Sequence, residues 1–192
     1  MSTGLRGNVI TSHFIVVCFV TCQTMAMTNS PWDQKIDDFY ELAFDESNPT
    51  ATIAAMRSLA SERPPGDASA LFELGGVHDS LGLETDAIPY YRAAIEAGLE
   101  GERATRVFIQ LASTLRNVGA SAEAVSILES APSLGNDDDA RQAFLALALY
   151  DEGRYGDALR TALLALIPTL DGYKRALKEY AEELPGTFPA RQ

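Results

Sequence analysis

The side chains that could carry out chemistry are few and lie far apart in this sequence. His78 is the only histidine beyond residue 13, and both cysteines, Cys18 and Cys22, lie near the N-terminus. A catalytic nucleophile needs a serine or cysteine held against a base such as histidine, and no such pair can be identified around His78. Gly75-Gly76 lies within a helical pattern and follows no strand, so it is not a phosphate-binding loop. We therefore predict that the protein is not an enzyme.

Two clusters have side chains that metal ions bind. Cys18 and Cys22 are four residues apart, but only His13 lies near enough in sequence to join them. Residues 136–139 are a run of amide and carboxylate side chains without the central Gly and terminal Glu of a calcium loop. We interpret this run as a helix cap, with Asp137 preceding the first turn. No metal or other cofactor is predicted.

The excess of acidic residues argues against one class of partner, nucleic acid. Fifteen Lys and Arg residues stand against 27 Asp and Glu residues, which gives a formal charge of −12. A surface of this sign repels a phosphate backbone, so nucleic acid is disfavoured as a main partner. The 46% apolar and 22% charged shares of the 192 residues are those of one soluble globular domain.

Helices must position the remaining candidate residues, because helical periodicity runs through the chain from Asp33 onward. Glycine and proline interrupt it at short intervals, and no stretch alternates as a strand does. Thr85 and Ser121 precede two of the expected helices and are predicted to cap them. The expected helices span roughly residues 33–45, 50–62, 68–81, 86–97, 102–118, 122–130, 138–152, 156–167 and 171–184.

An internal repeat organises these helices into pairs. Gly82 and Gly119 are 37 residues apart, and Gly119 and Gly153 are 34 apart. The same two separations connect four further columns, so five columns agree in register. These columns are Leu74, Leu111 and Leu145; Gly75, Ala112 and Ala146; Ala87, Ala124 and Ala158; and Ala94, Ala131 and Ala165.

Each column has a role in packing. A leucine followed by a small residue on the first helix of a pair lets the second helix approach closely. The glycine column ends the first helix, where the backbone must turn left-handed. The two alanine columns lie on one stripe of the second helix, where neighbouring helices cross. One pair cannot bury its apolar face alone, so stacked pairs share a continuous core.

The columns resemble the tetratricopeptide repeat. Three units over about residues 68–167, with the helix that follows them, are similar to the bacterial group 5 arrangement of that family. The resemblance implies an all-α fold, a right-handed superhelical solenoid of antiparallel helix pairs with a C-terminal capping helix. Residues 68–99 match best, through Leu74-Gly75, Gly82, Ala87, Tyr91 and Ala94.

Three departures from the family pattern affect packing. His78 stands where an aromatic residue or leucine is usual, and we interpret it as a helix-packing residue. Gln142 replaces a large apolar residue in the third unit, and Ala162 replaces the bulky residue of its second helix. The last repeat is therefore expected to pack more loosely.

The repeats also set the expected domain organisation. Residues 67–184 form the repeat domain, residues 32–66 form a degenerate helical repeat with Met56 and Leu59 in its core, and residues 185–192 form a flexible tail. The capping helix is expected to bury one apolar stripe and turn its charged side chains to water. That stripe is Leu170, Tyr173, Leu177, Tyr180 and Leu184.

The inner wall of such a solenoid is built mainly by the first helix of each pair. On the middle pair, Arg and amide side chains recur on the face opposite the Leu111–Leu115 core stripe. They suit a partner's carboxylate or peptide backbone, although the same residues could form an ordinary solvated face. We predict a non-enzymatic interaction module that binds a protein or peptide partner in its concave groove. The predicted groove residues are Phe72, Asp79, Arg106, Gln110, Ser113, Arg116, Asn117, Phe144 and Tyr150.

Residues 1–31 leave several interpretations open. Residues 7–32 carry no formal charge, and the apolar run 14–20 after Arg6 has the outline of a signal peptide, although it is short for a membrane span. A translation start at Met25 or Met27 would instead leave an ordinary lead into the first helix, and a disordered tail is a further interpretation. We expect a cytoplasmic protein. The alternative is an exported or membrane-anchored accessory protein acting through residues 7–27.

A chain that begins at Met27 is predicted to fold as well as the full chain, because the repeat core begins beyond Asp33. Thermal melts of both chains, followed by circular dichroism, measure this. Loss of cooperative helical melting in the shorter chain would contradict the prediction.

Overall fold

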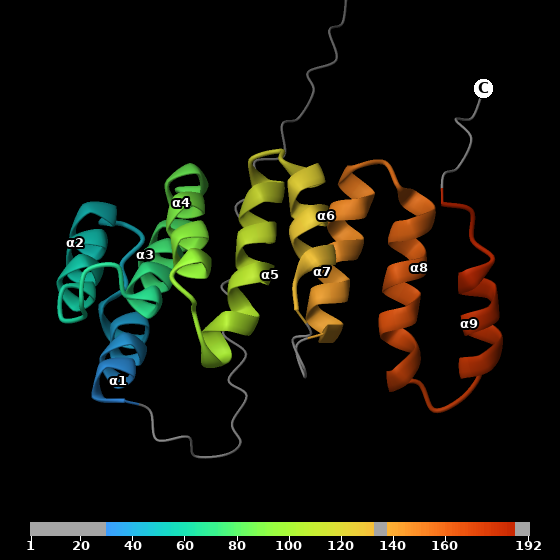
Figure 1. The fold of residues 1–192 in the computed structure, drawn as a ribbon, viewed down its shortest axis with the longest axis horizontal. Helices are drawn as coiled ribbons and strands as arrows, with labels where there is room; N and C mark the ends of the chain where they lie inside the picture. Colours follow the sequence, from blue (N-terminus) through green and yellow to red (C-terminus); the bar gives the residue numbers. More distant parts are fainter. Residues whose placement is uncertain (1–29, 133–137, 187–192) are drawn as a thin grey trace, which may run out of the picture.

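The computed structural model of the chain describes residues 30–132 and 138–186, and every regular element among them is helical. The helices follow one another along a single axis, and each packs against the next (Figure 1). The predicted all-α solenoid of helix pairs is confirmed. Most of the predicted segment 1–31 lies outside the described residues.

The elements match the expected helices closely in number and order. The first helix, α1 (Pro31–Asp38), continues into a π-helical turn, η1 (Phe39–Ala43). The helices that follow are α2 (Pro49–Ala60), α3 (Ala68–Ser80), α4 (Glu84–Glu96), α5 (Gly101–Asn117), α6 (Ser121–Ser130), α7 (Asp138–Asp151), α8 (Tyr155–Leu166), the 3-10 turn η3 (Ile167–Thr169) and α9 (Lys174–Glu182).

The same turn closes the helix pairs α3–α4, α5–α6 and α7–α8. The three glycines of the repeat column take the left-handed conformation, with φ of 70° at Gly82, 80° at Gly119 and 74° at Gly153. The residue after each glycine donates its N–H to a carbonyl five residues earlier, which closes the end of the first helix. These bonds run from Leu83 to His78 at 2.9 Å, from Ala120 to Leu115 at 2.8 Å and from Arg154 to Leu149 at 2.9 Å.

The predicted side-chain caps at Thr85 and Ser121 are wrong. The first of these helices begins two residues earlier than expected and the second one residue earlier, and neither Leu83 nor Ala120 at the N-cap position makes a side-chain cap bond. The turn is too tight for a polar cap, because the residue after the glycine both closes one helix and begins the next. Asp137, the third predicted cap, lies outside the described residues.

Close approach at the small-residue columns is confirmed. A Cβ atom on Gly75 would lie 2.7 Å from a ring carbon of Tyr91, which is closer than real Cβ contacts. Ala87, Ala112 and Ala124 are fully buried. The column at Ala94 fails in the second unit: α6 ends at Ser130, because Pro132 disfavours a helical backbone at the residue before it.

The buried side chains form two clusters. The larger one extends through α3 to α8 and contains Tyr91, Leu111 and Leu128. The smaller one joins α1, η1 and α2 to α3, with Met56 and Leu59 in the positions predicted for a degenerate repeat. His78 is also buried, with Nδ1 2.6 Å from the Leu74 carbonyl oxygen and its ring stacked on Tyr90 at 5.1 Å. It packs helices, as predicted.

The C-terminal helix departs from its expected packing. Of the predicted apolar stripe, Leu177 is half-buried, whereas Tyr173 and Tyr180 are 91% and 67% exposed. The reason is that α9 packs mainly against α8 and η3, so only one side of the stripe meets another helix. Within the described ranges, none of the helices combines the length and apolarity needed to cross a bilayer.

The substitution Ala124→Leu is predicted to lower the free energy of unfolding by roughly 1–3 kcal/mol, because Ala124 is fully buried where helices cross. The matched change Ala122→Leu on the exposed side of α6 should alter it by no more than about 0.5 kcal/mol. Urea melts measure both. Equal effects would show that the repeat register is wrong.

Candidate protein-binding surface

All of the predicted groove residues lie on the first helices of the three pairs, α3, α5 and α7. The middle one, α5, contacts both α3 and α7, so the three helices present one continuous surface. We call it the first-helix face: Asp79 on α3, the polar residues from Arg106 to Asn117 on α5, and Tyr150 on α7.

The register predicted for α5 is confirmed. Leu111 and Leu115 are buried in the larger core cluster, whereas Ser113 is partly exposed and Asn117 is exposed at the end of the helix. Opposite sides of one helix therefore serve the core and the first-helix face.

The two arginines predicted on this face have different surroundings. Arg116 is 2.7 Å from Asp151, through its Nε and the Oδ2 of the carboxylate, and this ion pair joins α5 to α7. Arg106 is partly exposed and forms no ion pair with any described residue, although its charge acts on Glu73 and Tyr40. Arg106 is therefore the cation of the face that a partner's carboxylate could pair with.

Gln110 is less accessible than its predicted role requires. Its Oε1 is buried and accepts no hydrogen bond within the described structure. Its backbone carbonyl accepts a bond from the Thr114 hydroxyl at 2.8 Å. An oxygen left in this state lowers stability, because burial removes its bonds to water without replacing them.

Phe72 and Phe144 do not present their rings as the groove prediction assumed. Phe72 is buried in the larger core cluster, with its ring centroid 5.9 Å from that of Tyr91. Phe144 is half-buried and packs against the same cluster. Both positions are covered because the first helices pack directly beside one another.

Asp79 lies in a more apolar setting than a groove carboxylate would. Tyr91 donates its hydroxyl hydrogen to Oδ2 of Asp79 at 3.2 Å. Burial raises the pKa of Asp79 to about 6, and hydrogen bonds with Thr114 and Tyr91 act in the opposite direction. Asp79 therefore serves the junction of α3, α4 and α5.

Sequence reasoning missed an ionic network that links the start of the face to α1. Arg103 donates through Nε to Glu73 at 2.7 Å and through one terminal nitrogen to Asp33 at 2.8 Å. Burial raises the pKa of the Glu73 carboxyl, and the Arg103 charge opposes this effect. The ring of Trp32 lies 5.4 Å from the Arg103 guanidinium and 5.3 Å from that of Arg63.

The unequal repeat spacing was the signal that could have revealed this network. The first interval between column glycines is 37 residues and the second is 34. The three additional residues extend α5, which has 17 residues against 13 in α3 and 14 in α7. Arg103 lies in this added turn, and therefore reaches back across α3 to α1.

The first-helix face is covered at its N-terminal end. A Cβ atom on Gly76 would lie 2.9 Å from the Tyr40 hydroxyl, so η1 packs directly on α3 at this point. Tyr40 stacks on Phe44, with ring centroids 6.0 Å apart. The accessible part of the face is therefore centred on α5 and α7.

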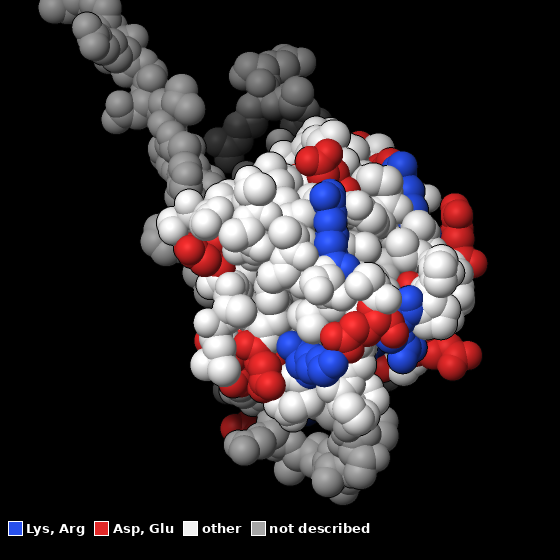
Figure 2. All heavy atoms as spheres, turned by 90° about the vertical axis from the view of Figure 1, so that its left-hand side faces the viewer, with Lys and Arg blue, Asp and Glu red and all other residues white. Residues whose placement is uncertain are grey.

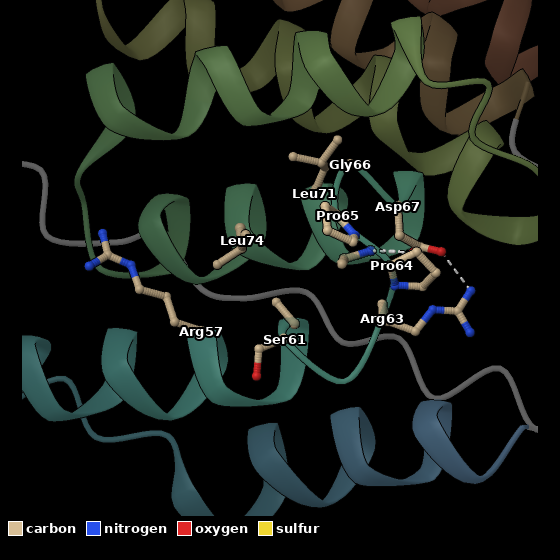
Figure 3. A pocket seen from close by; sticks show the side chains of 11 residues that line it. Arg57, Ser61, Arg63, Pro64, Pro65, Gly66, Asp67, Leu71 and Leu74 are labelled. Atoms are coloured by element: carbon tan, nitrogen blue, oxygen red, sulfur yellow. Dashed lines mark hydrogen bonds and ion pairs between the residues drawn. The ribbon is translucent and has the colours of Figure 1, made fainter.

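A separate pocket of about 360 Å³ lies at the turn between α2 and α3 (Figure 3). It includes the Pro64-Pro65-Gly66 turn, and Arg63 pairs with Asp67 at its edge at 2.8 Å. The other Asp67 oxygen accepts the Ala70 N–H at the start of α3. No predicted groove residue lines this pocket, and each oxygen of the Asp67 carboxylate already accepts a hydrogen bond that holds the turn.

Comparison with protein families decides the nature of the repeat. The family model described as Tetratrico peptide repeat matches residues 68–184. The chain belongs to this family. Tetratricopeptide repeats build scaffolds for interaction between proteins, and the chain is an interaction module in that general sense.

One solved structure similar to the chain is described as "Crystal structure of YrrB: a TPR protein with an unusual peptide-binding site". It is 16% identical, with a TM-score of 0.45, and the match covers 81% of this chain and 100% of that one. None of the curated proteins matches the chain. Among the described residues, no His, Cys, Asp and Glu side chains are grouped so as to hold a metal ion.

The raised pKa of Asp79 predicts a pH-dependent stability. The folded protein binds this proton more tightly than the unfolded chain, where the ordinary value is 3.8, so the contribution of Asp79 to stability falls as pH rises from about 4 to about 6. Asp79→Asn removes that loss. The free energy of unfolding of the variant relative to the wild type should rise by roughly 1–3 kcal/mol over this range.

Urea melts of both proteins between about pH 4 and pH 7 measure this difference. The matched control is Asp171→Asn, since Asp171 is exposed in the loop before α9. A difference between Asp79→Asn and the wild type that stays constant with pH would refute the assignment.

Proposed function

We propose that the first-helix face binds a short extended segment of a partner protein, and that Arg106 recognises an acidic group on it. The observation that carries this proposal is the contrast between the arginines. Arg103 and Arg116 are held in ion pairs, whereas Arg106 has no ion-pair partner among the described residues. In a chain of formal charge −12, a cation left without a partner on an interaction scaffold favours an acidic ligand group.

The neighbouring side chains suit a peptide backbone. Ser113 and Asn117 lie further along α5 and can donate and accept hydrogen bonds. Arg106 and Asn117 are eleven residues apart on one helix, which corresponds to about 16 Å. An extended peptide covers this distance with about five residues. The bound segment is therefore short, with its acidic group towards the start of α5.

Arg116 serves this surface indirectly. Its bond to Asp151 fixes the end of α5 against the end of α7, and so sets the distance between Asn117 and Tyr150. Reversing the charge of Arg116 would place two carboxylates together and disturb the scaffold. Arg106 is therefore the better probe of binding.

Arg106→Glu is predicted to weaken peptide binding about 10- to 100-fold, the loss expected for one hydrogen bond to a charged group. The probe is a set of peptides selected on the wild-type protein from a displayed library of random sequences. Fluorescence anisotropy then gives the dissociation constant of each peptide for the wild type and the variant. Urea melts check that the variant is folded, because reversing the Arg106 charge also removes its attraction for the buried Glu73 carboxylate.

The matched control is Arg57→Glu, which reverses an exposed charge on α2, away from the first-helix face. It should leave the dissociation constants unchanged. Equal affinity of the peptides for Arg106→Glu and the wild type would overturn the proposal. So would equal losses in Arg106→Glu and Arg57→Glu, since these would indicate attraction by overall charge alone.

A further inference from the structure

The two ends of the solenoid differ in polarity. Of the ten large hydrophobic side chains exposed in the described part of the chain, eight lie between Leu147 and Tyr180. The α1–α2 end carries basic side chains interspersed with acidic ones (Figure 2). Lys35 and Glu62, for example, pair there at 2.6 Å. The C-terminal end therefore exposes these hydrophobic side chains in addition to the charged side chains of α9, and exposed apolar surface of this extent marks interaction sites.

An apolar groove of about 760 Å³ runs between α7 and α8 at this end. Ala146, Ala158 and Ala162 are among the small residues that line it, while Tyr150 and Tyr155 form a pair with ring centroids 5.0 Å apart. The groove exists because of Ala162. The equivalent positions in the first two repeats hold Tyr91 and Leu128, both fully buried, so the third pair lacks a large side chain at this point.

The chain's own α9 does not fill this groove. No residue of α9 lines it. The C-terminal half of α9 is instead fixed to α8: Ala181 is fully buried, and the Arg160 guanidinium donates to the carbonyl oxygens of Ala181 and Leu184. The backbone of Pro185 lies so close to Gly156 that a Cβ atom there would overlap it. Moving α9 into the groove would break all of these contacts.

While it is fixed in this way, α9 presents two exposed tyrosines, which we call the tyrosine stripe. Tyr173 is the N-cap residue before the first turn, and Tyr180 lies within the helix. Tyr173 is the only non-glycine residue of the described chain with positive φ, at 61°, which strains the backbone where its ring projects outwards. Lys174 begins the helix and Glu182 ends it, the reverse of the order that the helix dipole favours.

We propose that two copies of this chain associate reciprocally, with the tyrosine stripe of α9 from each copy lying in the α7–α8 groove of the other. One chain carries both complementary surfaces, as a two-fold interface requires. Lys174 at the start of α9 would also approach the exposed Glu152 just beyond α7, where Asp151 is already paired with Arg116.

The exposed area suits such an interface. Tyr150, Tyr155, Tyr173 and Tyr180 are 61%, 48%, 91% and 67% exposed. At about 200 Å² for each side chain, they expose on the order of 500 Å² in each copy. Two copies with their groove leucines and alanines therefore reach the roughly 1,200 Å² that a stable interface buries. The proposal extends beyond peptide binding at Arg106, and only Tyr150 is common to the two surfaces.

Sedimentation velocity of the full chain over about 1–100 µM tests the association. The wild type is expected to sediment as a dimer. Tyr173→Ser combined with Tyr180→Ser, and separately Ala162→Glu in the groove, should each raise the dissociation constant at least about 100-fold. Leu42→Ser, which changes an exposed leucine near the opposite end, should leave it unchanged, as should Arg106→Glu.

Urea melts establish that each variant is folded. Should Ala162→Glu unfold early, Leu147→Glu at the groove edge replaces it, because Leu147 is half exposed. A wild type that is monomeric throughout the range overturns the proposal. Dimerisation unaffected by the stripe or groove variants overturns it as well.

A mixture of the two kinds of variant tests reciprocity. Neither variant alone retains a working contact, but a mixed pair keeps one, between the intact α9 of the groove variant and the intact groove of the tyrosine variant. The mixture should therefore form heterodimers at concentrations at which each variant alone is monomeric. A mixture that stays monomeric overturns the reciprocal arrangement.

Discussion

The close contact between Gly75 on α3 and the ring of Tyr91 on α4 is the constraint from which much of the architecture follows. The ring lies where a Cβ atom would be, so the two helices meet at a distance that no larger residue on α3 permits. Ala112 and Ala146 occupy the equivalent positions in the next two pairs. In each pair the left-handed glycine after the first helix turns the chain so that the second helix packs against this small residue. Because every pair is closed in this way, pairs can stack and share one core.

The additional length of α5 determines which ion pairs form between neighbouring helices. The three residues added at the start of α5 bring Arg103 within reach of Glu73 and Asp33, so one guanidinium connects α5 to α3 and α1. Arg116 forms the equivalent link between α5 and α7 at the other end of the helix. Arg106 lies between these two links and has the same side-chain chemistry, but neither bond. We therefore propose a role in recognition for Arg106, because Arg103 and Arg116 already have ion-pair partners.

The sequence predicted those features that depend on local periodicity. The helix order, the glycine turns and the buried alanines all repeat at fixed spacing, and Ala87 and Ala124 lie where the columns placed them. Features that depend on contact between distant segments were missed. The burial of Phe72 results from packing between neighbouring first helices, and the pairing of Arg116 requires knowing that Asp151 lies beside it. The caps at Thr85 and Ser121 failed because one residue of the turn serves two helices at once.

The volume of the residue at the Tyr91 position also determines how the solenoid ends. Tyr91 and Leu128 fill the space between the helices of their pairs and give the next first helix a surface to lie on. Alanine at 162 leaves that space empty, so the next helix, α9, can bury Ala181 against α8 but has no side chain to meet near α7. The open groove is therefore the result of one small side chain. A solenoid that ends in this way buries Leu145 and Leu149 of its last pair but leaves Ala162 and the tyrosines of α9 exposed.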